Sequence, residues 1–162
     1  MSQSPQPGPS QKRAPDPRRR RASYDLTGFR VRGFKSLRDE QGIELRPLTI
    51  LAGANSSGKS SMMQALLLLK QTLDSPVDPG ALLLQGANVR LTSVQQVLTK
   101  ASPPVQEFSV KLETSSGTLQ VLFKPRNRSE LRGFDVMETV YEHGRTGEVR
   151  LTTEPPGGGD RR

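Results

Sequence analysis

One eight-residue stretch constrains the fold of this chain more than any other, because it fixes two glycines, a lysine and a serine at set spacing. Residues 53–60 read Gly-Ala-Asn-Ser-Ser-Gly-Lys-Ser and match the pattern G-x-x-x-x-G-K-[ST]. An apolar run over residues 48–52 precedes the stretch, and an apolar segment with helical spacing, residues 58–73, follows it. The sequence therefore predicts a buried strand, a tight loop and a largely buried helix in this order.

The residue types of this stretch, the P-loop or Walker A motif, suit a loop that wraps phosphate groups. Glycines permit turns that a side chain would obstruct, and successive backbone N–H groups then form a nest for an anion. The N-terminus of the following helix adds its unpaired N–H groups. Lys59 is expected to reach the β- and γ-phosphates, and Ser60 to place its hydroxyl on Mg²⁺.

The motif therefore predicts ATP and Mg²⁺ as the bound cofactors, with Ser60 as the metal ligand. The nucleotide-binding residues predicted within and beside the motif are Gly53, Asn55, Ser57, Gly58, Lys59, Ser60 and Ser61.

Composition excludes several other classes of protein. The chain has 162 residues, no cysteine and a single histidine, His143. Disulfide scaffolds, cysteine-ligated metal sites and thiol nucleophiles are therefore excluded. The longest apolar run, Ala65–Leu69, is far shorter than a membrane span, and no secretory signal is readable. We therefore expect a cytoplasmic protein without membrane contact.

Most of the net charge of +8 lies at the N-terminus. Residues 1–24 hold six basic residues against Asp16 and are rich in proline, serine and glutamine, which predicts a disordered basic tail. The proline- and glycine-rich residues 155–162 predict a second disordered tail, so that residues 25–154 form the folded lobe. The basic tail is read either as an arm for nucleic acid or an acidic partner, or as a solvated extension.

Alternating apolar residues predict the strands of the folded lobe. Strands are expected at residues 29–32 and 43–45, and a hairpin is expected from residues 108–112 and 119–123. Further strands are expected near residues 134–140 and 149–151, and a short second helix over 93–100. The predicted fold class is α/β, a partial P-loop lobe of the ABC type. It would combine a mixed sheet and the P-loop helix with an antiparallel β subdomain.

Residues 29–73 also carry a family resemblance. They combine a strand that ends in Phe34-Lys35-Ser36, a second stretch reading P-L-T-I-L-A-G-A-N, and the P-loop. This order resembles the N-terminal part of the ATPase heads of RecF, SMC and OLD proteins, and most of all the RecF-like AAA-family ATPases of prokaryotes. The resemblance implies that two heads enclose ATP between the Walker A motif of one and the signature motif of the other. It also implies that Lys35 and Ser36 lie near the nucleotide.

The motifs needed for hydrolysis do not follow the loop. A Walker B strand ends in an aspartate that helps to hold Mg²⁺, usually followed by a glutamate that orients water. The apolar runs after the loop end in Lys70, Gln85 and Lys124, and no signature motif is present. We therefore expect a truncated head without catalytic residues of its own, which hydrolyses ATP only when a second lobe supplies them. The expected partners are nucleotide, a second lobe or head, and, by resemblance, DNA.

Two alternative functions stay open on the sequence. A small complete P-loop kinase or NTPase would need an acidic Mg²⁺ partner, and such kinases usually open on the P-loop strand, whereas a strand pair precedes it here. A non-catalytic or vestigial protein would bind nucleic acid or a partner through the basic tail.

Overall fold

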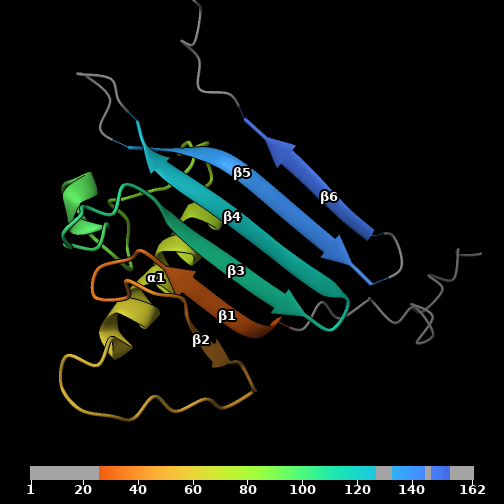
Figure 1. The fold of residues 1–162 in the computed structure, drawn as a ribbon, viewed down its shortest axis with the longest axis horizontal. Coiled ribbons are helices and arrows are strands. Elements are labelled where there is room, and N and C mark those ends of the chain that lie inside the picture. The colour runs from red at the N-terminus through yellow and green to blue at the C-terminus, as the bar shows by residue number, and fades with distance from the viewer. Residues whose placement is uncertain (1–25, 127–132, 145–146, 154–162) are drawn as a thin grey trace, which may run out of the picture.

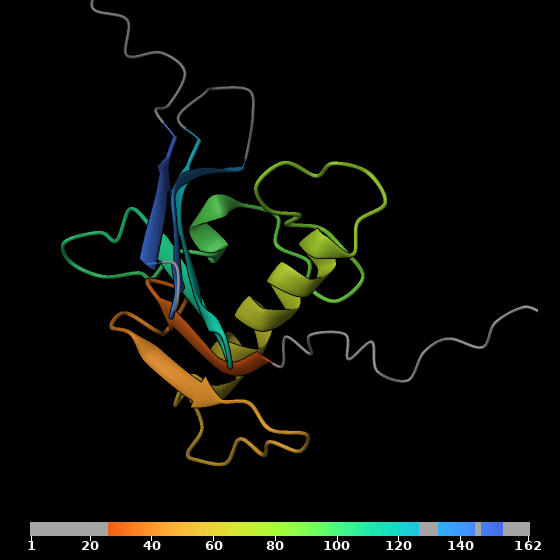
Figure 2. The same ribbon diagram turned by 90° about the vertical axis from the view of Figure 1, so that its right-hand side faces the viewer.

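In the residues that the structure describes, the fold is a single antiparallel sheet with one α-helix on one of its faces (Figures 1 and 2). The computed structural model describes residues 26–126, 133–144 and 147–153, so both predicted tails lie outside the described residues. The strands are β1 (Leu26–Arg32), β2 (Gln41–Glu44), β3 (Phe108–Thr114), β4 (Gly117–Pro125), β5 (Phe134–His143) and β6 (Gly147–Thr152). The helices are α1 (Lys59–Leu73) and a short 3-10 helix, η1 (Val94–Gln96).

The sheet has the order β2-β1-β3-β4-β5-β6, and every described pair of neighbours is antiparallel. The predicted hairpin is confirmed as β3 and β4, and the two predicted later strands are confirmed as β5 and β6. The predicted mixed sheet is wrong for the described residues. Strands β3 to β6 pair in chain order, and the segments between them have fewer residues than a parallel connection needs.

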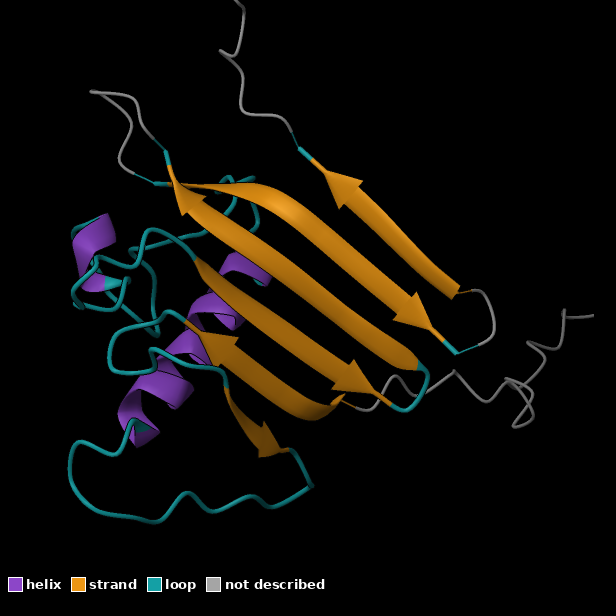
Figure 3. Ribbon diagram, viewed as in Figure 1, coloured by secondary structure: helices purple, strands orange, loops and turns teal. Residues whose placement is uncertain are grey.

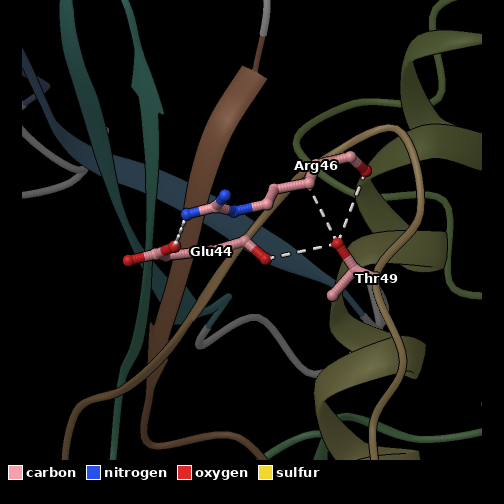
Figure 4. Close-up of polar contacts among 3 residues, drawn as sticks. All are labelled: Glu44, Arg46 and Thr49. Atoms are coloured by element: carbon pink, nitrogen blue, oxygen red, sulfur yellow. Dashed lines mark hydrogen bonds and ion pairs between the residues drawn. The ribbon is translucent and has the colours of Figure 1, made fainter.

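The predicted strand over residues 48–52 is also wrong, because this segment forms part of a loop (Figure 3). Leu48 and Ile50 are 79% and 78% exposed. The hydroxyl of Thr49 accepts a hydrogen bond from the Arg46 N–H at 3.0 Å, which turns the chain at the start of the segment (Figure 4). A strand with apolar residues on both faces needs neighbours to cover it, and no described strand lies beside this segment.

Only one face of helix α1 packs on the sheet, so the helix is less buried than its apolar sequence predicts. Met62, Ala65 and Leu68 are buried in the core, whereas Leu73 is 78% exposed and Met63 is half-exposed. The start and end of the helix agree with the sequence to within one residue. The predicted helix over residues 93–100 is wrong, because only η1 forms there. None of the helices in the described part of the chain is long and apolar enough to cross a membrane.

An aromatic cluster holds the sheet and the strand connections together around Phe108. The ring of Phe108 stacks on Phe123 with centroids 4.8 Å apart, and it meets Phe34 and Phe134 edge-on at 5.8 and 5.1 Å. All four rings are at most 3% exposed. Aromatic pairs in these geometries stabilise a core beyond the area that they bury.

Gln71 joins the far end of α1 to the connection that follows it. Its side chain is buried, and its amide nitrogen donates to the carbonyls of Leu83 and Val89 at 2.6 and 3.0 Å. Its amide oxygen accepts from the N–H groups of Asn88 and Val89 at 3.1 and 2.8 Å. A buried amide with both ends satisfied fixes the connection without leaving a polar group unpaired.

Candidate functional site

The loop of residues 53–58 leads directly into α1 and takes its shape from three positive φ angles. These are 148° at Gly53, 66° at Ser56 and 90° at Gly58. Gly58 is the N-cap of α1, and no side chain caps the first turn. The backbone N–H groups of that turn therefore have no side-chain acceptor. A Cβ atom on Gly58 would lie 2.5 Å from Cδ2 of Leu37. Conformation therefore favours glycine at position 58, and a side chain there would also require Leu37 to shift.

The ammonium group of Lys59 lies inside this loop. Its Nζ donates to the carbonyl oxygens of Gly53 and Ala54 at 2.8 and 2.5 Å and to the hydroxyl of Ser57 at 3.2 Å. An ammonium group has three donors, so the loop satisfies all of them. The loop thus surrounds a fixed positive charge at the start of a helix, where the helix dipole also favours an anion.

A cavity of about 340 Å³ opens over the start of α1. Its lining brings together, from two parts of the chain, Ser36, Asn55, Ser56, Ser57, Gly58, Lys59, Ser60 and Ser61. A second cavity of about 310 Å³ shares Ser36, Ser56 and Ser57 with it and adds polar side chains of Arg38, Asp39 and Gln41. Gly53 lines a third, more apolar cavity of about 390 Å³ on the β2 side of the loop. Hydroxyls, backbone groups and one cation therefore dominate the first cavity.

Ser36 and Lys35 both contact the first two turns of α1. The hydroxyls of Ser36 and Ser61 lie 2.8 Å apart, and Nζ of Lys35 donates to Oε1 of Gln64 at 2.6 Å. Burial lowers the pKa of Lys35 from its usual value, because a buried ammonium loses hydration. Ser36 therefore lies in the lining of the cavity, whereas Lys35 lies beside it on the helix surface.

The donor set fits a magnesium ion that arrives with phosphate, and not a metal held by the protein alone. The side chains in the described ranges include no group of three or more histidine, cysteine, aspartate or glutamate residues that could hold a metal. Mg²⁺ usually keeps several waters and takes one or two protein ligands together with phosphate oxygens. The exposed hydroxyl of Ser60 can be one such ligand.

Three residues of the site were missed by the motif. Ser56 occupies a variable position of the pattern, so its positive φ leaves no signal in the sequence. Leu37 contacts Gly58 only through the folded chain. Gln64 follows Ser60 by four residues and so lies on the same helix face, a spacing that could have marked it as a neighbour of the site.

A comparison with family models matches residues 25–141 to the AAA ATPase domain. This range contains β1, the loop, α1 and the sheet up to Tyr141 in β5. The chain belongs to the AAA ATPase domain family. The loop and its cavity thus lie inside the AAA ATPase domain, and the prediction of an AAA-family ATPase is confirmed. No curated protein and no solved structure matches the chain. The narrower likeness to RecF, SMC and OLD heads stays a prediction, as do the nucleotide-binding roles of the residues above.

Proposed function

We propose that this chain binds Mg-ATP through residues 53–61, as the N-terminal part of a RecF-like ATPase head of the ABC type. Membership of the AAA ATPase domain family supports nucleotide as the ligand. The position of Lys59 carries the proposal: its ammonium lies among the loop oxygens at the start of α1, beside a cavity lined by hydroxyls.

Each part of the loop has a role in this proposal. The unpaired N–H groups of the first turn of α1 and the charge of Lys59 hold the phosphates. The Ser60 hydroxyl faces the metal, which neutralises phosphate charge when it is bound. Ser36 holds the Ser61 hydroxyl at 2.8 Å and so orients it at the edge of the cavity. Binding requires Lys59 to exchange some of its loop oxygens for phosphate oxygens, and charge-assisted bonds to phosphate favour this exchange.

Hydrolysis belongs, in this proposal, to a second lobe that supplies the Walker B and signature motifs. The exposed apolar segment around Leu48 and Ile50 supports this division of roles. Its side chains suit a strand that is covered on both faces, and a neighbouring strand from the second lobe would cover them.

Calorimetric titration with Mg-ATP tests the proposal. We expect the chain to bind Mg-ATP and the Lys59→Ala variant to bind at least about tenfold more weakly, because it lacks the charge-assisted contact. Lys70→Ala is the matched control: it removes a lysine from the same helix that pairs with Asp74 far from the loop. This control should bind like the unaltered chain. Equal affinity in the unaltered chain and Lys59→Ala, or no binding by either, would overturn the proposal.

A further inference from the structure

Strand β6 leaves one side of its backbone without a partner in the described structure. It is the last strand in the sheet order, and all six of its residues are exposed. Just beyond it, Thr153 donates its N–H to the carbonyl of Met137, next to β5, at 2.9 Å. Because alternate residues of a strand point their backbone groups the same way, the odd-numbered residues of β6 bond β5. The N–H and C=O groups of Glu148, Arg150 and Thr152 therefore point outward from the edge.

The apolar face of the sheet, which α1 covers only near β1, continues to this edge (Figures 1 and 2). Strand pairing places Phe29, Leu112, Leu119, Tyr141 and Val149 in one row across five strands. Phe29 is fully buried at one end of the row, and Val149 is 51% exposed at the other. Leu151, on the same face of β6, is 65% exposed. This apolar face is covered by α1 near β1 and is open at β6.

On the other face of β6, Arg150 pairs with Glu148 and Glu138 within the chain at 2.9 and 3.2 Å, and the charges of β6 are also self-complementary between two copies in one register. If β6 pairs antiparallel with a second β6 and Val149 lies opposite its own copy, Glu148 lies opposite Arg150 at two symmetric positions. Opposite charges on directly facing residues stabilise a strand pair. Moving the axis by one residue to Arg150 would instead place two arginines face to face, which is unfavourable.

We infer that β6 pairs with β6 of a second copy of this chain in the register centred on Val149. Glu148 and Arg150 then exchange N–H and C=O bonds with the second copy, giving four backbone hydrogen bonds. The two copies of Val149 form a close pair without backbone bonds, with Cα atoms about 4.5 Å apart. The apolar faces of both sheets lie on the same side, so Val149 and Leu151 extend one continuous apolar strip.

This contact is small and should be weak. A single strand pair of about five residues buries less than the roughly 1,200 Å² at which stable interfaces begin. The association is therefore expected to depend on protein concentration. It does not rest on the proposed nucleotide binding, because β6 and the loop of residues 53–58 lie in different parts of the fold.

Single cysteines test the register directly, because the chain has no cysteine of its own. Under mild oxidation, Val149→Cys should form a disulfide-linked dimer at least about tenfold faster than Arg150→Cys or Leu151→Cys, because only residue 149 faces its own copy within disulfide reach. The readout is the dimer fraction on a non-reducing gel, with circular dichroism to verify that each variant is folded. Faster linkage at residue 150 would overturn the register. Equal rates at the three positions would overturn the pairing.

Charge exchange tests the same contact without a covalent bond. Glu148→Arg and Arg150→Glu should each weaken dimerisation severalfold in sedimentation equilibrium, because like charges then face each other. The double variant Glu148→Arg/Arg150→Glu should restore dimerisation, since it regenerates the opposite pairs with reversed sign. A double variant as weak as the single ones would overturn the inference, as would an unaltered chain that stays monomeric at millimolar concentration. Recruitment of an unrelated protein to β6 in place of a second copy would also overturn it.

Discussion

The sheet with its helix and the loop of residues 46–58 use similar apolar residues with opposite results. In the sheet, Phe29 and Val31 are buried because α1 and the aromatic cluster cover them. In the loop, Leu48 and Ile50 remain exposed, although their sequence pattern is as apolar as that of a core strand. The difference shows that an apolar pattern indicates that a segment needs to be covered by other residues. The pattern alone does not show whether the described fold covers it.

Two contacts fix the end of the loop that meets α1. Leu37, which follows β1, lies against Gly58 at the end of the loop, and Ser36 binds Ser61 in the first turn of α1, just after the loop. The exposed loop is thus anchored at the helix end, where the candidate site lies. Its other end carries the turn of Arg46 and Thr49, whose side chains bind Glu44 at the end of β2.

The largest effect is expected when one apolar side chain is removed from each region and the changes in stability are compared. Phe108→Ala should lower the free energy of unfolding by about 3–5 kcal/mol, because it empties the centre of the aromatic cluster. Ile50→Ala should change it by less than about 0.5 kcal/mol, because the side chain is already in water. Urea unfolding measures both. A loss of several kcal/mol in Ile50→Ala would show that the loop is packed and would break the comparison.

The second test concerns the buried amide of Gln71. Gln71→Ala should cost about 2–3 kcal/mol, because the carbonyls of Leu83 and Val89 and the N–H groups of Asn88 and Val89 lose their partner. Gln64→Ala, on the same helix but at its partly exposed face, is the control and should cost less. Hydrogen exchange at the Val89 amide should also quicken in Gln71→Ala. Equal losses in the two variants would contradict this account.

The third test separates backbone strain from crowding at the anchored end of the loop. Gly58 and Gly80 both have positive φ, so alanine strains both, but only the Cβ at position 58 meets another atom, Cδ2 of Leu37. Gly58→Ala should therefore cost about 1–2 kcal/mol more than Gly80→Ala in thermal or urea unfolding. Adding Leu37→Ala should reduce this excess. An equal cost at both glycines would show that Leu37 does not anchor the loop.

The smallest expected effect is the pH dependence that Lys35 contributes at the boundary of the two regions. Burial lowers its pKa below the usual 10.5. Between the lowered pKa and 10.5 the unfolded chain holds a proton that the folded chain has released, so the free energy of unfolding rises with pH in this window. The stability of the unaltered chain relative to Lys35→Met should therefore increase as the pH rises toward 10.5. A difference that stays constant in urea unfolding across this range would contradict the prediction.

Local patterns were sufficient to predict much of the fold. The alternation in residues 108–123 gave the hairpin because each strand meets its neighbour through a short turn, and Gly58 and Leu73 marked the ends of α1 because both are local signals. The same rule failed at residues 48–52, because the described residues supply no strand beside this segment to bury it. The candidate loop was found from its glycines and Lys59, whereas Leu37 could not be placed without the fold that brings it to Gly58.

The pairing of β1 with β3 has a consequence for the order of folding. Arg30 lies opposite Lys111, about 80 residues further along the chain, whereas β3, β4 and β5 each pair with the next strand. Closing the long connection costs more chain entropy than closing a hairpin, so the meander should form before β1 docks. The loop and α1 lie within this last-closing segment. An intermediate in which β1 is still detached would therefore carry the complete Gly53–Ser60 motif, but its helix would have no β1 to pack against and its loop no fixed shape.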